Sequence, residues 1–359
     1  MVMNKSYIFI IGLKKNHCRK MRRAKLVEVG KIIIEEDVPK PILDSQEVLI
    51  RTSYCGICGS DIAAYLGEHP FIHPPIVLGH EACGVVEEIG EEVNNISKGD
   101  KVVIEPLITC GACYNCQSGN YNRCDKIKVV GCQLDGAFSE FFKIPYYRVY
   151  RLPDEIPLSV ATLIEPLAVA VHAVTRAKIT REDNVVVIGD GPIGLLTAFI
   201  ARNSGAEVAI IGISDYKLNV AESLGITNTI NAKRDNVYEI LKNTFNRIDV
   251  IIECVGHTSV TLNQAIDLAR RGGRIVILGV FHEEVPVKIG YVQDKELELY
   301  GSLVYVSSDF HRAIDIASQT SQKLKGLITK VFPLDKTDEA FQYILQKRDE
   351  VVKVIIRAS

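Results

Sequence analysis

The segment that most constrains the fold is a glycine turn in the middle of the chain. Residues 184–188 read Asn-Val-Val-Val-Ile, an unbroken apolar run that is typical of a strand buried on both faces. The turn Gly189-Asp-Gly-Pro-Ile-Gly194 follows, and residues 195–202 then have a helical pattern. A G-x-G-x-x-G turn that follows a strand and opens a helix is typical of dinucleotide binding. We therefore predict cofactor contacts at Gly189, Gly191, Pro192, Ile193 and Gly194.

The rest of the chain shows two kinds of pattern. After the turn, apolar runs at 207–211, 248–256 and 273–279 alternate with helical stretches, which predicts a doubly wound parallel sheet. Residues 21–104 instead form short alternating strands divided by glycines and acidic turns, which predicts an antiparallel, barrel-like domain. The predicted fold class is therefore α/β, with one barrel-like domain and one doubly wound domain.

We expect the doubly wound domain to interrupt the barrel-like one. Helical stretches and a final apolar strand follow residue 305, and we expect this tail to return to the first domain. The first residues stand apart, because an apolar run precedes their basic residues, the reverse of a secretory signal. The expected organisation is an N-terminal extension, or an over-assigned start, at 1–20, a catalytic domain at 21–160 and 305–359, and a cofactor domain at 161–304.

Side chains that bind metals gather between residues 53 and 81. Cys58 offers a thiolate, His80 an imidazole and Glu81 a carboxylate, and zinc accepts all three ligand types. A catalytic zinc takes about three protein ligands and keeps one position open. Glu165 is the best candidate for a further ligand, because a carboxylate in an apolar run needs a partner or a cation. A salt-bridged core glutamate is the alternative.

A second set of cysteines follows in one short segment. Cys110, Cys113, Cys116 and Cys124 are separated by two, two and seven residues. Four thiolates at these spacings can close around one tetrahedral zinc. Since all four ligand positions are then filled, we expect a structural role. An iron–sulfur cluster, which also takes four cysteines, is the chemical alternative.

Composition excludes several classes of function. The net charge of −2 gives no electrostatic reason to expect nucleic acid or an acidic membrane as a partner. No segment is long and apolar enough to predict a membrane span. Seven of the ten cysteines lie between Cys55 and Cys124, at spacings that favour metal binding in a reducing compartment. We therefore expect a cytoplasmic protein.

These motifs together resemble the zinc-dependent medium-chain dehydrogenase family, from residue 21 to the end. The resemblance is closest to the polyol (sorbitol), butanediol and threonine branch. It implies a GroES-like catalytic domain, a Rossmann-like cofactor domain, one catalytic and one structural zinc, and a homo-oligomer such as a dimer or tetramer. It implies Cys58, His80 and Glu165 as ligands of the catalytic zinc, with Glu81 in reserve.

The resemblance also implies roles around the metal site and shows departures from the family. Ser60 matches the hydroxyl that accepts the alcohol proton, and Asp61 is expected to accept the free ring N–H of His80. The family often has a histidine where this chain has Ala63. His69 and His73, on a nearby proline-rich loop, are candidates to replace it, with ordinary loop histidines as the alternative.

The predicted cofactor preference depends on the end of the second strand of the parallel sheet. Relatives that use NAD have an acid there, which binds the ribose 2′-hydroxyl. In this chain the position falls on Gly212, so we expect no repulsion of a 2′-phosphate. Ser214 and Lys217 are candidates to bind that phosphate. The sequence therefore favours NADP, with use of both cofactors as an alternative and Asp215 as a second candidate for the ribose.

The expected reaction is the reversible oxidation of a secondary alcohol, diol, polyol or sugar-type hydroxyl in a small molecule, with hydride transfer to NAD(P). Val304 stands beside Tyr305 where the polyol branch often has an arginine, which weakens the case for a sugar. The alternatives are oxidation of an amino alcohol such as threonine, a zinc-free reductase and a non-catalytic dinucleotide-binding protein.

Overall fold

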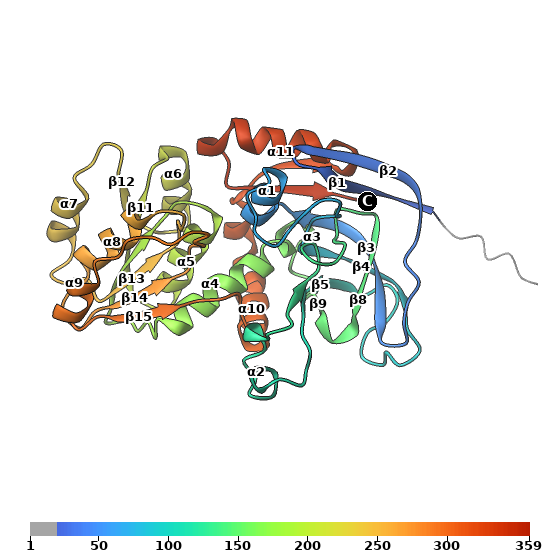
Figure 1. Ribbon diagram of the computed structural model, residues 1–359, viewed down its shortest axis with the longest axis horizontal. Helices are drawn as coiled ribbons and strands as arrows, with labels where there is room; N and C mark the ends of the chain where they lie inside the picture. The colour runs from blue at the N-terminus through green and yellow to red at the C-terminus, as the bar shows by residue number, and fades with distance from the viewer. Residues whose placement is uncertain (1–19) are drawn as a thin grey trace, which may run out of the picture.

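The computed structural model describes residues 20–359, so the predicted extension at 1–20 lies outside the described residues except for Lys20. Figure 1 shows a parallel sheet with its helices on the left and a mostly antiparallel sheet on the right. The predicted α/β class with two kinds of sheet is confirmed. Among these residues, no helix is both long enough and apolar enough to cross a membrane.

The parallel sheet has six strands in the order β12-β11-β10-β13-β14-β15 among the described residues. Val185 and Val187 point into one hydrophobic cluster and Val186 and Ile188 into another, which explains the unbroken apolar run of β10. The strands are β10 (Asn184–Ile188), β11 (Glu207–Gly212), β12 (Asn228–Asn231), β13 (Val250–Glu253), β14 (Arg274–Ile277) and β15 (Glu298–Gly301). The helices are α5 (Pro192–Asn203), α6 (Asp215–Ser223), α7 (Val237–Thr244), α8 (Ser259–Leu268) and α9 (Ile289–Asp294).

The second sheet follows the order β16-β17-β3-β4-β5-β9, and β8 also pairs with β3. Only the pair β16 and β17 is parallel among the pairs described for this sheet. Its strands are β3 (Glu47–Gly56), β4 (Glu81–Ile89), β5 (Lys101–Ile104), β8 (Phe141–Pro145), β9 (Val149–Arg151), β16 (Ile328–Pro333) and β17 (Lys353–Arg357). Two smaller pairs are β1 (Lys20–Glu28) with β2 (Lys31–Pro39), and β6 (Leu107–Ile108) with β7 (Lys128–Val129).

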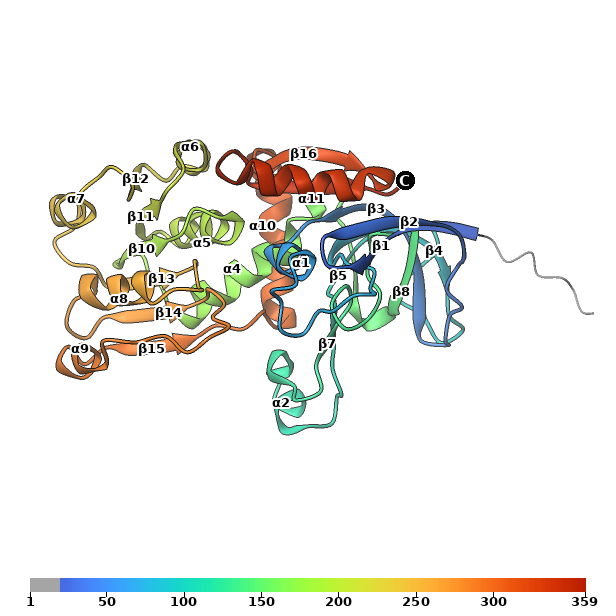
Figure 2. The same cartoon turned by 45° about the horizontal axis from the view of Figure 1, so that its top comes forward.

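The end of the described chain returns to the second sheet, because β17 pairs with β3. Both views show the C-terminal strands and helix α11 (Thr337–Gln346) beside the N-terminal strands, although these segments are far apart in sequence (Figures 1 and 2). This arrangement is the one expected of the tail. The bounds proposed for the domains fall within helix α3 (Leu158–Ala161) and after β15.

Two helices join the sheets. Helix α4 (Ile164–Arg176) and helix α10 (Ser307–Lys325) lie between them in Figure 1. Leu167 and Val171 of α4 share one buried cluster with Phe310 of α10 and Val185 of β10. One hydrophobic core therefore extends from the parallel sheet through α4 and α10.

Candidate active site

The pairing of β3 with β4 brings the metal-binding segments together. Gly56, at the end of β3, pairs with Glu81, the first residue of β4. His80 precedes β4, and Cys58 is the N-cap of helix α1 (Gly59–Tyr65). The backbone N–H of Cys58 donates to Asp61 Oδ2 at 2.8 Å, which anchors the first turn of α1.

Cys58, His80 and Glu81 form a compact group. One ligand atom from each residue lies within 4.8 Å of the others, and His80 and Glu81 are buried. Sulfur, nitrogen and oxygen donors at this separation suit zinc, which accepts thiolate, imidazole and carboxylate together. The donor set of this chain therefore fits a zinc ion.

Lys353 is a functional residue that sequence reasoning missed. It lies on β17, is almost fully buried, and its Nζ is 2.7 Å from both carboxylate oxygens of Glu81. It also donates to the carbonyl of Ile57 at 3.2 Å. A lone lysine in the apolar run Val-Val-Lys-Val-Ile-Ile was the available signal, since a buried ammonium needs a charged partner.

Glu165, the other predicted carboxylate ligand, is buried in the first turn of α4. It does not belong to the compact group of Cys58, His80 and Glu81 within the described chain. Its Oε1 accepts a hydrogen bond of 2.9 Å from the hydroxyl of Tyr305. Burial raises the pKa of Glu165 to about 7, against the opposing effect of nearby His80. Its role as a ligand stays a prediction.

The predicted hydrogen bond between His80 and Asp61 is absent. His80 Nδ1 and Asp61 Oδ1 are 3.7 Å apart, which is too long for a hydrogen bond. Both atoms are buried without a hydrogen-bond partner in the described structure. Burial alone would lower the pKa of His80, but the charges of Asp61 and Cys58 and the contacts with the thiols of Cys132 and Cys58 together outweigh burial and raise that pKa well above its ordinary value. The carboxylate of Asp61 instead directs its other oxygen toward the amide of Cys58.

One cavity of about 320 Å³ joins the metal group to the glycine turn. Cys58, Ser60 and Glu81 line one side. The opposite side is lined by residues of the predicted cofactor turn, Gly191, Pro192, Ile193 and Gly194. Ser60 thus faces the space between the two predicted sites.

The loop histidines differ in position. His69 lines the cavity, as does Ala63, whereas His73 is not among the residues that line it. His69 Nδ1 accepts hydrogen bonds of 3.1 Å from the amides of Phe71 and Ile72. Burial lowers the pKa of His69, and neighbouring His282 lowers it further. His69 therefore lines the cavity with its Nδ1 already occupied as an acceptor.

The glycine turn has room for a dinucleotide. Gly189 leads from β10, and Gly191 is the N-cap of α5, so the amides of the first turn of α5 face the cavity. A Cβ added at Gly191 would have no protein atom within 4 Å, so the space there is open. A Cβ at Gly194 would lie 1.9 Å from the carbonyl oxygen of Gly189, so this position requires glycine. The turn therefore fits a pyrophosphate.

The residues predicted to select the cofactor lie around the end of β11. Gly212 is the last residue of that strand. Ser214 caps helix α6, and its hydroxyl donates to the carbonyl of Asp349 at 2.5 Å. Lys217 lines a neighbouring cavity of about 600 Å³ that also includes Cys58 and Pro192.

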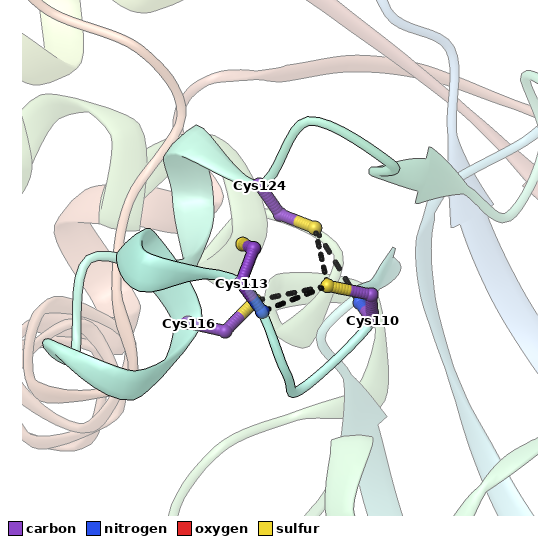
Figure 3. Close-up of side chains that lie close together, drawn as sticks. All are labelled: Cys110, Cys113, Cys116 and Cys124. Carbon is purple, nitrogen blue, oxygen red and sulfur yellow. Dashed lines mark hydrogen bonds between the residues drawn. The ribbon is translucent and has the colours of Figure 1, made fainter.

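Four cysteines come together in a lobe that projects from the body of the molecule (Figures 2 and 3). The lobe is built on helix α2 (Tyr114–Gln117) and the loops around it. Cys110 Sγ lies 3.5 Å from Cys124 Sγ and 3.9 Å from Cys116 Sγ. Sulfurs on a tetrahedral zinc, with bonds of about 2.3 Å, lie about 3.8 Å apart. The residues Cys110, Cys113, Cys116 and Cys124 therefore fit one zinc ion.

Backbone amides donate hydrogen bonds to two of the sulfur atoms in this lobe. The amides of Cys110 and Lys126 each donate to Cys124 Sγ at 3.4 Å, and the amide of Cys113 donates to Cys110 Sγ at 3.4 Å. Hydrogen bonds from the amides of Ala112 and Cys113 lower the pKa of Cys110 to about 6. The thiolate form that binds metals is therefore favoured at this position.

Comparison with known families matches both halves of the chain. Residues 44–154 match the alcohol dehydrogenase GroES-like domain, and residues 192–319 match the zinc-binding dehydrogenase family. Sorbitol dehydrogenase from Bacillus subtilis strain 168 is 32% identical over 89% of this chain and 93% of its own length. L-threonine 3-dehydrogenase from Deinococcus deserti is 32% identical over 87% and 92%.

Several solved structures are similar in fold to this chain. A protein from Sinorhizobium meliloti 1021 bound to NADP has a TM-score of 0.86 and 30% identity, covering 95% of this chain and all of that one. A short chain alcohol dehydrogenase from Escherichia coli CFT073 complexed with NADH has a TM-score of 0.88 and 28% identity. The match covers 94% of this chain and 99% of that one. The 2R,3R-butanediol dehydrogenase from Bacillus subtilis has a TM-score of 0.86 and 30% identity, covering 94% and 100%.

Proposed function

The chain belongs to the zinc-dependent medium-chain dehydrogenase family, and we propose that it reversibly oxidises a secondary hydroxyl of a small diol or polyol with NAD(P). The observation that carries this proposal is the single cavity between Cys58, Ser60 and Glu81 on one side and the glycine turn on the other. A substrate in this cavity lies between a metal-binding group and a dinucleotide-binding turn, as hydride transfer requires.

Cys58 and His80 would bind the catalytic zinc, and the closeness of Glu81 to both supports Glu81 as the carboxylate ligand, with Glu165 as the alternative. Zinc supplies a Lewis acid that lowers the pKa of a substrate hydroxyl. A second zinc in the lobe of Cys110, Cys113, Cys116 and Cys124 has a structural role.

The chain's own groups provide the remaining steps. Ser60, on the first turn of α1, accepts the hydroxyl proton of the substrate and passes it outward. Lys353 balances the charge of Glu81 and keeps that carboxylate in the cavity wall. The amides at the start of α5 hold the pyrophosphate, which directs the nicotinamide, the hydride acceptor, toward the cavity.

The cellular compartment, the oligomeric state and the cofactor preference are proposed from the sequence. The thiol-rich metal sites suit a cytoplasmic, reducing compartment. A homo-oligomer is expected from the family resemblance. Threonine-like amino alcohols remain a second substrate class, and a threonine dehydrogenase is among the relatives. The NADP preference expected from Gly212 assumes that no carboxylate lies at the end of β11.

Turnover by the zinc-loaded protein tests this function. Secondary alcohols, diols, polyols and threonine should be assayed with NAD⁺ and with NADP⁺, and nicotinamide reduction followed at 340 nm. We expect turnover with at least one diol or polyol and loss of turnover when a chelator removes zinc. Undiminished activity in protein shown to be metal-free would contradict the proposal, and activity with threonine alone would favour the second substrate class.

A further inference from the structure

The end of β11 carries a carboxylate that does not come from β11. In dinucleotide-binding sheets, an acid at this place accepts hydrogen bonds from the adenosine ribose. Gly212 has no side chain to do so. The glycine turn packs directly against this strand end, because the amide of Gly189 donates to the carbonyl of Ile211 at 2.8 Å. The next residue of the turn, Asp190, therefore lies beside Gly212.

The carboxylate of Asp190 occupies the space that a side chain at position 212 would take. A Cβ built on Gly212 would lie 2.6 Å from Asp190 Cβ and 2.6 Å from its Oδ2. Asp190 Oδ2 accepts two hydrogen bonds, from the amide of Ile213 at 2.7 Å and from that of Ser214 at 2.8 Å. Asp190 is only 7% exposed, so this position is held by its contacts. Glycine at 212 and aspartate at 190 are thus sterically complementary.

Two other side chains at this strand end, those of Ser214 and Asp215, are already engaged. Ser214 uses its hydroxyl on the carbonyl of Asp349, so it is not free to bind a phosphate. Asp215 Oδ1 is bound by Asn231 at 2.8 Å and by Arg234 at 2.6 Å. Within residues 20–359, Asp190 Oδ1 makes no hydrogen bond, and it is not enclosed either, so it remains available as an acceptor.

We propose that Asp190 is the residue that selects the cofactor, and that it makes the enzyme prefer NAD to NADP. This inference rests on the proposed use of a nicotinamide dinucleotide. Asp190 Oδ1 accepts hydrogen bonds from the ribose hydroxyls, in place of the acid missing at Gly212. The same carboxylate repels a 2′-phosphate.

Two physical effects act against a 2′-phosphate. A phosphate there would bring a second negative charge next to Asp190, and like charges within a few ångströms repel strongly where solvent is excluded. The amides of Ile213 and Ser214, which would otherwise attract an anion, already donate to Asp190. The absence of an acid at Gly212 therefore does not remove the negative charge from this place, and the basis for expecting NADP is lost.

Equilibrium binding to the zinc-loaded enzyme tests the inference without depending on turnover. Calorimetry should give dissociation constants for NAD⁺ and NADP⁺, and competition should give them for 5′-AMP and adenosine 2′,5′-bisphosphate. We expect the ligands without the 2′-phosphate to bind at least about tenfold more tightly, about 1.4 kcal/mol. Tighter binding of the 2′-phosphorylated ligands would overturn the inference, and this measurement needs no variant.

Asp190→Asn removes the charge and keeps the shape and one acceptor oxygen. The ratio of the dissociation constants for NADP⁺ and NAD⁺ should fall at least about tenfold. Asp215→Asn is the matched control, because it removes a carboxylate from the same strand end that is bound to Asn231 and Arg234 instead. An unchanged ratio in Asp190→Asn, or an equal change in both variants, would refute the role of Asp190.

A double variant moves the acid to the strand. Gly212→Asp alone would push its Cβ against Asp190, so it should weaken both cofactors. Asp190→Gly combined with Gly212→Asp removes this collision, because glycine has no Cβ, and should recover a preference for NAD over NADP that Asp190→Gly lacks. If both single variants and the double variant share one ratio, the inference is wrong.

The outcome also separates this inference from the proposed function. Failure of the wild-type enzyme to bind either dinucleotide would contradict both. Binding of both dinucleotides with a ratio insensitive to Asp190 would contradict the inference alone and leave the dehydrogenase function in place.

Discussion

The buried amine of Lys353 lies 2.7 Å from both carboxylate oxygens of Glu81. Both side chains are almost fully buried, so neither charge is compensated by water. This pair differs from the surface pairs of the chain, such as Lys347 with Glu350, whose side chains are 50% and 63% exposed. Removal of the lysine should therefore change the free energy of unfolding much more for the buried pair than for the surface pair.

Lys353→Met should lower the free energy of unfolding by about 3–5 kcal/mol, because it leaves the Glu81 carboxylate buried without its cation. Lys347→Met should lower it by less than about 1 kcal/mol. Denaturant unfolding of the zinc-free proteins measures both, because a bound zinc ion would supply Glu81 with another cation. Equal small effects in the two variants would mean that Glu81 is not held as a charged group by Lys353.

Asp249 should make stability depend on pH. Burial alone would raise its pKa, but the amide of Asn184 and the guanidinium groups of Arg270 and Arg247 outweigh burial and lower it. A lowered carboxyl pKa contributes stability above the unfolded value, about 3.9, and that contribution is lost as the pH falls through the folded value.

Asp249→Asn should therefore cost about 2 kcal/mol at neutral pH, and the difference from wild type should shrink below about pH 4. Unfolding measured from pH 7 to pH 3 tests this sign. Asp154→Asn is the control, because its side chain is 95% exposed and pairs with Lys101 at 3.5 Å. A constant difference across this range would exclude the role given to Asp249.

Sequence reasoning found residues whose neighbours along the chain reveal their chemistry. Cys58 and His80 stand in short motifs, and both belong to the compact metal group. Lys353 was missed because its partner is Glu81, and only the pairing of β17 with β3 brings the two together. Asp190 was missed for a similar reason, since its role depends on the empty side-chain position at Gly212 on another strand.

At the scale of elements, local patterns predicted more than long-range ones. The strand, turn and helix from β10 to α5 were predicted because one apolar run and three glycines encode them. The lobe of four cysteines was predicted because its spacing is local. The position of Glu165 outside the compact metal group could not be predicted, because it depends on how α4 packs against the second sheet.

The lobe should depend on its metal, since helix α2 has four residues and buries none of them. Cys113→Ser should reduce the zinc content from two ions per chain to one and lower the melting temperature by several degrees. Metal analysis and calorimetry measure these effects. Ser118→Ala, in the same lobe, should retain both zinc ions and the wild-type melting temperature. Unchanged zinc content in Cys113→Ser would exclude a zinc site in the lobe.

At the scale of the whole molecule, the proposed metal site and the proposed cofactor site belong to different sheets, and residues of both sites line one cavity. A substitution that abolishes binding at one of these two sites should therefore leave binding at the other intact. Cys58→Ala should abolish turnover while the dissociation constant for the cofactor changes less than about threefold, because Cys58 belongs to the metal group.

Gly191→Val is the reciprocal variant. Its new side chain meets no protein atom within 4 Å of the Cβ, so the fold should tolerate it, but it fills the space expected for the pyrophosphate. Cofactor affinity should fall at least about tenfold with the zinc content unchanged. Loss of zinc from Gly191→Val, or loss of cofactor binding from Cys58→Ala, would show that the two functions are not separable.

The position of β17 also sets an order of assembly during synthesis. All strands of the parallel sheet are contiguous between residues 184 and 301, so that sheet can form while the ribosome is still extending the chain. The second sheet receives β17 only later, between β16 and β3. Until then Glu81 has no lysine beside it, and the growing chain holds a finished dinucleotide fold next to an unfinished metal site. A nascent chain should therefore acquire cofactor affinity before Glu81 gains its ion pair with Lys353.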